Sequence, residues 1–219
     1  MKRLKYTLIS DGPTDAILIP IINWALKKTG GVELANGVCA EFWRLPNPPN
    51  GLTARMLKAV ELYPCEVLFV HRDAEKDSPQ IRSAEIRAAV TNAQASGFQL
   101  PVVTVIPIRM VEAWLLFDER AIRHAAGNPS GRVKLNLPSL QNVESRPDPK
   151  RDLRLALQTA SELRGRRLKK FHTLSAFWSV VDHLDDFTPL RQLSGFLAFE
   201  RTVCCIRDNQ WQPQFYGLD

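Results

Sequence analysis

Two acidic residues separated by one position are the clearest candidates for chemistry in this sequence. Residues 67–70 form a short apolar run typical of a buried strand, and Asp73 and Glu75 follow it closely. If the strand stays extended through Glu75, both carboxylates point to one face, roughly 7 Å apart along the backbone. A divalent cation would relieve the repulsion between two such charges. Simple solvation of both acids at a strand end is the alternative.

Further acids follow two other stretches with strand-like patterns. Asp11 and Asp15 flank the turn after residues 4–10, and Glu112 follows the β-branched run at residues 101–106. The carboxyl ends of parallel strands meet at one edge of a sheet, so we expect these acids to converge there. Hard oxygen ligands of this kind suit Mg²⁺ or Mn²⁺, which can activate water and neutralise charge during phosphodiester cleavage.

Three of these acids also have a purely structural interpretation. Asp15 is expected in the first turn of a helix, and Glu112 is expected in the first turn of an apolar helix that ends near Asp118. A carboxylate in the first turn is stabilised by the helix macrodipole. We favour the structural interpretation for Asp15 and Asp118, whereas for Glu112 the structural and supporting-ligand interpretations both remain open.

An alternation of strands and helices would position these acids. The expected strands are residues 4–10, 38–45, 67–70 and 101–106, and the expected helices between them follow Thr14 and cover residues 52–62 and 80–96. This order predicts an α/β fold with a mainly parallel sheet covered by helices on both faces. By strand alternation, His71 should share the face of Asp73, while Arg72 should point to the opposite side.

The sequence changes character after the α/β pattern. Residues 127–149 are rich in Gly, Pro, Asn and Ser, which indicates a long loop. Helical spacing of apolar residues resumes over residues 149–163, 174–184 and 189–206. We therefore expect an α/β core over residues 1–126 and a helical region over residues 127–219 that packs on this core.

The charge balance favours an anionic partner. The net charge is +6 and the isoelectric point is near 9.3. A basic run near the helical region contains Arg164, Arg166, Arg167, Lys169 and Lys170, and Lys150, Arg151 and Arg154 could extend it. These cations, with Arg72 if the strand has already ended there, are candidates for binding the phosphates of DNA or RNA. An ordinary solvated face is the alternative for the basic run.

Other patterns restrict the class of protein. The cysteines show no CxxC spacing, which favours reduced thiols and a cytoplasmic location. No stretch approaches the ~20 apolar residues of a membrane span, so no membrane partner is expected. P-loop, nucleophile-elbow and His-Glu-x-x-His motifs do not occur, which weighs against P-loop NTPases, α/β-hydrolases and zincins.

The acidic motifs resemble those of the TOPRIM fold, which topoisomerases, primases and overcoming-lysogenization-defect nucleases share. That fold has a Glu-Gly turn after its first strand and an Asp-x-Asp motif after a later strand. This chain has Asp11-Gly12 and Asp73-Ala74-Glu75 at the matching places, so each motif carries one exchanged acid. The resemblance implies a metal site formed by Asp11, Asp73 and Glu75, supported by Glu112.

A closer resemblance is to a family of small TOPRIM-like bacterial proteins. It is carried by four segments: Asp11-Gly12-x-Thr14-Asp15, Arg72-Asp73-x-Glu75, residues 107–118 and Asp148-Pro149-Lys150. Many members of that family lie in phage-defence gene neighbourhoods and have no assigned reaction. This resemblance implies a bacterial defence role and a partner such as an ATPase or another defence subunit.

These features support two hypotheses from different classes. The first is a Mg²⁺-dependent phosphodiesterase or nuclease component, in which Asp11, Asp73 and Glu75 are catalytic. The second is a non-catalytic TOPRIM-like subunit that binds nucleic acid or a protein within a larger defence complex. The exchanged acids motivate the second hypothesis, because a carboxylate displaced by about 1 Å can weaken catalysis appreciably.

Overall fold

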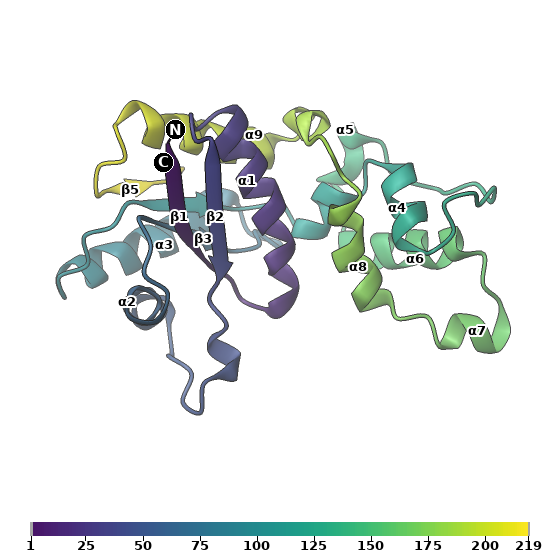
Figure 1. The fold of residues 1–219 in the computed structure, drawn as a ribbon, viewed down its shortest axis with the longest axis horizontal. Helices are drawn as coiled ribbons and strands as arrows, with labels where there is room; N and C mark the ends of the chain where they lie inside the picture. Colours follow the sequence, from purple (N-terminus) through teal and green to yellow (C-terminus); the bar gives the residue numbers. More distant parts are fainter. Residues whose placement is uncertain (1, 219) are drawn as a thin grey trace.

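A five-stranded parallel sheet forms the centre of the molecule in the computed structural model, which describes residues 2–218. The strands lie in the order β2-β1-β3-β4-β5 (Figure 1). They are β1 (Arg3–Ile9), β2 (Leu34–Cys39), β3 (Val67–His71), β4 (Val102–Val105) and β5 (Phe215–Tyr216). The chain proceeds from β1 to one side and from β3 to the other, so the direction of winding reverses between β1 and β3. The expected α/β fold with a parallel sheet is confirmed.

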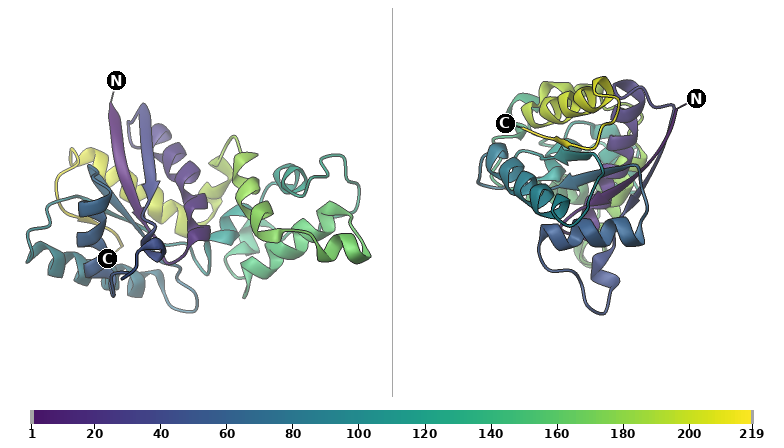
Figure 2. Two further views of the ribbon diagram at one scale, coloured as in Figure 1. Left: turned by 60° about the horizontal axis from the view of Figure 1, so that its bottom comes forward. Right: turned by 90° about the vertical axis from the view of Figure 1, so that its left-hand side faces the viewer.

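Helices cover both faces of this sheet (Figure 2). They are α1 (Leu18–Lys28) and α9 (Ser194–Asp208) on one face, and α2 (Leu52–Leu62) and α3 (Pro79–Gln94) on the other. Strand β3 is buried throughout because its side chains alternate between these layers. Phe69 packs with the first layer, whereas Leu68 and Val70 pack with the second. The continuous apolar run of this central strand follows from its burial on both sides.

A lobe of short helices extends from one side of the sheet (Figure 1). It contains α4 (Glu119–Ala125), α5 (Leu140–Val143), α6 (Pro149–Ser161), α7 (Gly165–Lys169) and α8 (Thr173–Asp182). Four 3₁₀ helices complete the described elements: η1 (Pro13–Ile17), η2 (Phe42–Arg44), η3 (Val111–Leu115) and η4 (Thr188–Gln192). The last segment returns to the sheet, where α9 packs against β4 and β5 pairs with β4. Packing of the carboxyl-terminal region on the core was expected, whereas β5 was not.

The edge strand β2 lies earlier in the chain than expected. It covers Leu34–Cys39, and the aromatic and apolar residues expected in the strand at 38–45 instead enter η2. The side chains of β2 alternate between exposed and half-buried, so the strand lacks the apolar run that marks a buried strand. Its Gly37 faces Tyr6 of β1, and a Cβ atom at this position would collide with the tyrosine ring.

The segments that follow β3 and β4 also differ from expectation. Strand β3 ends at His71, and Glu75 has a left-handed φ of 54°. The strand therefore does not stay extended through Glu75, and the two acids do not share one strand face. After β4, the expected long helix up to Asp118 is the short η3, and Asp118 instead caps α4 by accepting a hydrogen bond from the Ala121 amide.

Candidate functional site at the carboxyl edge of the sheet

Buried charged side chains meet where β1, β3 and β4 end. Asp15 comes from η1 after β1, His71 and Asp73 come from the end of β3, and Glu112 comes from η3 after β4. Asp15, His71 and Glu112 are all buried. Parallel α/β sheets bind ligands outside the carboxyl ends of their strands at the point where the winding reverses. This group lies at that point, between β1 and β3.

His71 is held between the sheet and two carboxylates. Its Nδ1 lies 3.0 Å from the carbonyl oxygen of Val105. A carbonyl oxygen only accepts, so Nδ1 carries a hydrogen and Nε2 faces the acids. The Nε2 atom is 3.5 Å from Asp73 Oδ1 and 3.9 Å from Asp15 Oδ2. The imidazole ring therefore lies beside both carboxylates, and Asp73 is its nearer acidic neighbour.

Asp73 has an environment that favours its protonated form. Burial raises the pKa of this carboxyl to about 6, and the charges of Glu112 and Asp15 add to the rise. His71 and the hydrogen bond from the Val111 amide, 3.0 Å from Oδ1, act in the opposite direction on this pKa. A carboxyl group with this pKa can exchange a proton near neutral pH, as acid–base catalysis requires.

Glu112 is the most deeply buried carboxylate at this edge, and Lys150 is its cationic neighbour. Burial raises the pKa of Glu112, while Lys150 opposes the rise. The Lys150 ammonium nitrogen lies 3.6 Å from Glu112 Oε1, and more than half of the lysine side chain is exposed. This pair joins the acidic group of the sheet edge to the first turn of α6 in the helical lobe.

Asp11 is not directed into this acidic group. Its carboxylate is 50% exposed and pairs with Arg55 at 3.2 Å and with Arg72 at 3.3 Å. Arg72 also approaches Glu85 of α3, at 3.7 Å. His71 and Arg72 therefore point to opposite sides, as strand alternation predicts. Arg72 is held by carboxylates, so binding of a phosphate by this residue stays a prediction.

Glu75 also turns away from the buried acids. Its backbone has left-handed geometry, its side chain is mostly exposed, and its carboxylate approaches Arg82 at 3.7 Å. The guanidinium of Arg109 donates a hydrogen bond to the Glu75 carbonyl oxygen. These contacts hold the turn after Asp73 in place. The expected pairing of Asp73 with Glu75 is thus replaced by pairing of Asp73 with His71.

The buried acids agree with a divalent cation in their chemistry. Asp15, Asp73 and Glu112 supply hard oxygen donors, and their mutual repulsion contributes to the raised pKa values of Asp73 and Glu112. Within residues 2–218, however, no three His, Cys, Asp or Glu side chains have an arrangement that could hold a metal ion. His71 and Lys150 face the acids instead, so a cation would compete with both for these oxygens.

The expected basic run forms α7 and its flanks at the far end of the lobe (Figure 1). All five cations of the run, Arg164, Arg166, Arg167, Lys169 and Lys170, are exposed. They lie away from the carboxyl edge of the sheet, and contact with nucleic acid remains a prediction for them. Lys150 is the basic residue of the lobe that contacts the acidic group directly.

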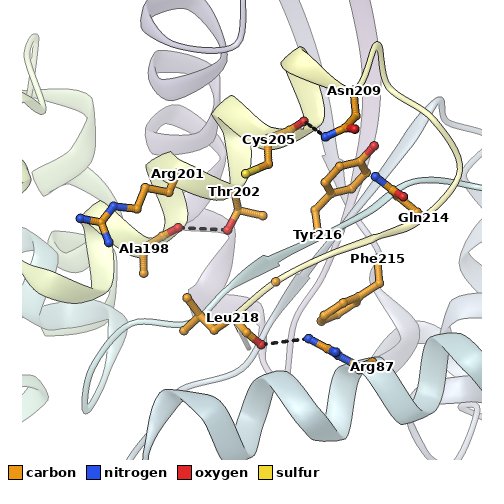
Figure 3. Close-up of a pocket in the computed structure, with 11 residues that line it drawn as sticks. Arg87, Ala198, Arg201, Thr202, Cys205, Asn209, Gln214, Phe215, Tyr216 and Leu218 are labelled. Carbon is orange, nitrogen blue, oxygen red and sulfur yellow. Dashed lines mark hydrogen bonds between the residues drawn. The ribbon is translucent and has the colours of Figure 1, made fainter.

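A cavity of about 550 Å³ lies between α3, α9 and β5, apart from the buried acids (Figure 3). Several of its polar groups already bind neighbouring main-chain oxygens. Thr202 donates to the Ala198 carbonyl, and Asn209 donates to the Cys205 carbonyl. Arg87 points toward the C-terminal strand and donates to the Leu218 carbonyl. The cavity is therefore a less suitable place for acid–base chemistry than the sheet edge.

Comparisons of the chain with protein-family models, curated proteins and solved structures found no match. In the part of the chain that the structure describes, no helix has the length and apolar character needed to cross a membrane. The assignment of the site therefore depends on the residues and their geometry.

The structure also shows which site residues the sequence could have indicated. Asp73 and Glu112 were candidates, and strand alternation placed His71 beside Asp73. The structural interpretation of Asp15 accounts for one of its contacts, because its carboxylate accepts a hydrogen bond from the Gly12 amide at the start of η1. The same carboxylate also faces His71, which the sequence did not indicate. The contact between Lys150 and Glu112 joins segments distant in sequence, and no local pattern indicates it.

Proposed function

We propose that the protein is a phosphodiesterase or nuclease-like component that acts on nucleic acid at the carboxyl edge of its sheet. The observation that carries the proposal is the convergence of His71, Asp15 and Glu112 around Asp73, where the strand winding reverses. Asp73 replaces the more exposed Asp11 and Glu75 as the centre of the proposed site. The TOPRIM-like relationship stays part of this proposal, supported by the parallel sheet and the acids after β1 and β3.

Different residues of the site would provide proton transfer, positive charge and metal ligands. Asp73 would hold and transfer the proton, because burial raises the pKa of its carboxyl to about 6, and the His71 ring, with Nε2 3.5 Å away, would help to position this carboxyl. Lys150 provides positive charge beside Glu112, and Arg55 and Arg72 provide it beside Asp11, where these cations would attract a phosphate. Because no three of the described acidic or histidine side chains are arranged to hold a metal ion, Mg²⁺ or Mn²⁺ would have to bind through single carboxylates of Asp15, Asp73 or Glu112 together with water and substrate phosphates, and would then neutralise charge and activate water.

A second function is favoured by a specific observation. Asp11 and Glu75, the residues at the exchanged motif positions, lie in ion pairs with arginines. A subunit that binds nucleic acid or a protein without turnover would tolerate this arrangement. An ATPase or another phage-defence subunit is the partner that this alternative predicts, and such a partner is compatible with both functions.

Cleavage of labelled single- and double-stranded DNA and RNA tests the proposed function. We expect cleavage with Mg²⁺ or Mn²⁺, none with a chelator, and a loss of at least about 100-fold in Asp73→Asn, because the variant lacks the proton-holding carboxyl. Asp15→Asn should also lose activity. Asp185→Asn is the matched control, since this acid is 89% exposed on the lobe.

Three outcomes separate the possibilities. Cleavage that Asp73→Asn retains in full would point to a contaminating nuclease and contradict the site. Binding of nucleic acid without cleavage under all metal conditions would favour the non-catalytic subunit. A loss of activity in Asp11→Asn or Glu75→Gln that exceeds the loss in Asp15→Asn would return the catalytic role to the residues of the sequence motif.

A further inference from the structure

A cavity in the helical lobe combines positive charge with an apolar surface. Its volume is about 290 Å³, and it lies between α6 and α8, which pack side by side. Lys150, Arg151 and Arg154 of α6 line it, together with Leu174 and Phe177 of α8. Leu174 is 56% exposed, so its apolar side chain is accessible to a ligand. The cavity thus offers cations and accessible apolar surface to one ligand.

The arginines of this cavity have no counterion. Among the residues that the structure describes, the guanidinium groups of Arg151 and Arg154 form no ion pair or hydrogen bond. Arg146 on the preceding turn, by contrast, pairs with Asp152 at 2.6 Å. Residues 150, 151 and 154 occupy neighbouring positions on one helix, where like charges repel each other. An anionic ligand would remove this repulsion.

An acidic residue also lines the cavity, but it is already engaged. The Asp148 side chain caps α6 by accepting a hydrogen bond from the Arg151 amide at 2.8 Å. It therefore stabilises the helix start and leaves the two arginine side chains available to a ligand.

The cavity adjoins the acidic group of the sheet edge. Lys150 lines the cavity, and its ammonium nitrogen is 3.6 Å from Glu112 Oε1. Lys150 thus links the cavity to the acidic group. Farther along the same helix, the exposed Leu155 lines a second cavity of about 500 Å³, together with the exposed Val133 of the loop before α5 and Arg164. Cations and exposed apolar side chains thus alternate toward α7.

We propose that the α6–α8 cavity binds a nucleotide of a single-stranded nucleic acid, with its base against Leu174 and its phosphate on Arg151 and Arg154. The inference rests on the proposed function. It specifies that the substrate of that site is single-stranded and that it runs from the α6–α8 cavity toward Glu112. A base can reach an apolar surface only when it is unpaired, so the cavity selects single strands over duplexes. The neighbouring phosphate then lies at Lys150, next to Glu112.

Equilibrium binding tests this proposal without any cleavage. Fluorescence anisotropy would measure the affinity of a labelled single strand of about 12 nucleotides in chelator, with the Asp73→Asn protein. We expect Arg151→Ala/Arg154→Ala to weaken binding about 10-fold and to reduce the slope of log K against log salt by ~1.4, from ~0.7 for each lost phosphate contact. Arg3→Ala is the matched control, because this exposed arginine lies at the opposite end of β1.

The base contact has its own test. Leu174→Ser should weaken binding of the normal strand several-fold and leave binding of a strand of abasic sites unchanged, because the abasic strand lacks the group that Leu174 contacts. Leu155→Ser, at a leucine of α6 that is 47% exposed, checks whether the second cavity contributes. Thermal unfolding of each variant verifies that these surface changes leave the fold intact.

Other results would overturn the inference. Equal affinity for duplex and single strand, equal loss for normal and abasic strands in Leu174→Ser, or wild-type affinity in the double arginine variant would each contradict it. A polyglutamate peptide that competes as well as the oligonucleotide would indicate an acidic protein partner instead. Failure of the proposed function is distinguishable: it would appear as absent cleavage in the wild-type protein, while binding would retain its dependence on Arg151, Arg154 and Leu174.

Discussion

At the scale of single residues, the carboxyl of Asp73 is expected to lower the stability of the fold at neutral pH, although the proposed function requires it. The folded protein holds its carboxyl proton with a pKa of about 6, compared with 3.8 for an unperturbed aspartate. Between these pH values the folded state binds more protons than the unfolded state. The free energy of unfolding contributed by this group therefore falls as pH rises through this window and stays reduced at neutral pH.

Asp73→Asn should consequently stabilise the protein at neutral pH. We expect the free energy of unfolding to increase by roughly 1–3 kcal/mol at pH 7, since each pKa unit corresponds to about 1.4 kcal/mol. The increase should nearly vanish at pH 4, where the wild-type carboxyl is protonated in the folded state. Urea denaturation at both pH values measures this difference. Asp185→Asn, an exposed aspartate, should show no such pH-dependent gain. A gain of equal size at both pH values would contradict the assigned environment of Asp73.

The residue scale also shows what the sequence could and could not predict about the site. Asp73 and Glu112 follow strands, and that position alone predicts convergence at one sheet edge. The side-chain directions depend on where β3 ends. Because the chain turns after His71 and Glu75 adopts a left-handed backbone, Glu75 leaves the site, and arginines from other elements draw Asp11 outward. Such contacts between distant segments leave no local pattern in the sequence.

At the scale of elements, helices with clear ends were predictable and edge elements were not. Helix α2 has the expected bounds, and α3 begins at Pro79, one residue before its expected start. Strand β2 was misplaced because one of its faces is exposed and its apolar signal is weak. Strand β5 has two residues, too few for any periodicity. The segment after β4 was predicted as an apolar helix ending near Asp118 because it is rich in apolar residues, but it forms the short η3, all five residues of which are buried.

The misplaced strand contains a position where only glycine fits. Gly37 of β2 pairs with Tyr6 of β1, and the buried tyrosine hydroxyl donates to Asn23 Oδ1 at 2.9 Å. The ring is therefore held over the glycine and cannot move aside without losing this bond. We expect Gly37→Ala to lower the free energy of unfolding by about 1–3 kcal/mol, as overpacking typically does. Urea denaturation followed by circular dichroism measures the change.

Two further variants make this prediction specific. Gly12→Ala should change stability by less than about 0.5 kcal/mol, because Gly12 has extended backbone and its Cβ would meet no atom closer than 3.9 Å. Adding Tyr6→Leu to Gly37→Ala should recover part of the loss, since the ring that obstructs the new methyl group is removed. An additive loss in the double variant would show that the ring is not the obstacle.

At the scale of the whole molecule, one apolar core joins the sheet to the helical lobe. Buried residues run from Phe69 of β3 through Trp114 of η3 to Leu153 of α6. The Trp114 ring contacts Phe196 of α9, with centroids 5.3 Å apart. The last segment thus closes over a core that residues on both sides of position 126 build. The division of the chain into residues 1–126 and 127–219 describes composition better than it describes packing.

A shared core predicts that the sheet and the lobe unfold together. Leu153→Ala removes a fully buried side chain from α6, and we expect the free energy of unfolding to fall by roughly 2–4 kcal/mol. Circular dichroism, which follows all helices, and tryptophan fluorescence, which follows Trp24 of α1 and Trp114 among others, should shift to the same lower midpoint. Leu155→Ala is the matched control two positions away, where the leucine is 47% exposed, and it should cost less than about 1 kcal/mol. Separate midpoints for the two probes in Leu153→Ala would show instead that the lobe unfolds on its own. Cooperative unfolding would mean that one core holds Lys150 of α6 beside Glu112 of η3 and also positions Asp73. The proposed substrate-binding residues and the acidic residues would then form one rigid site.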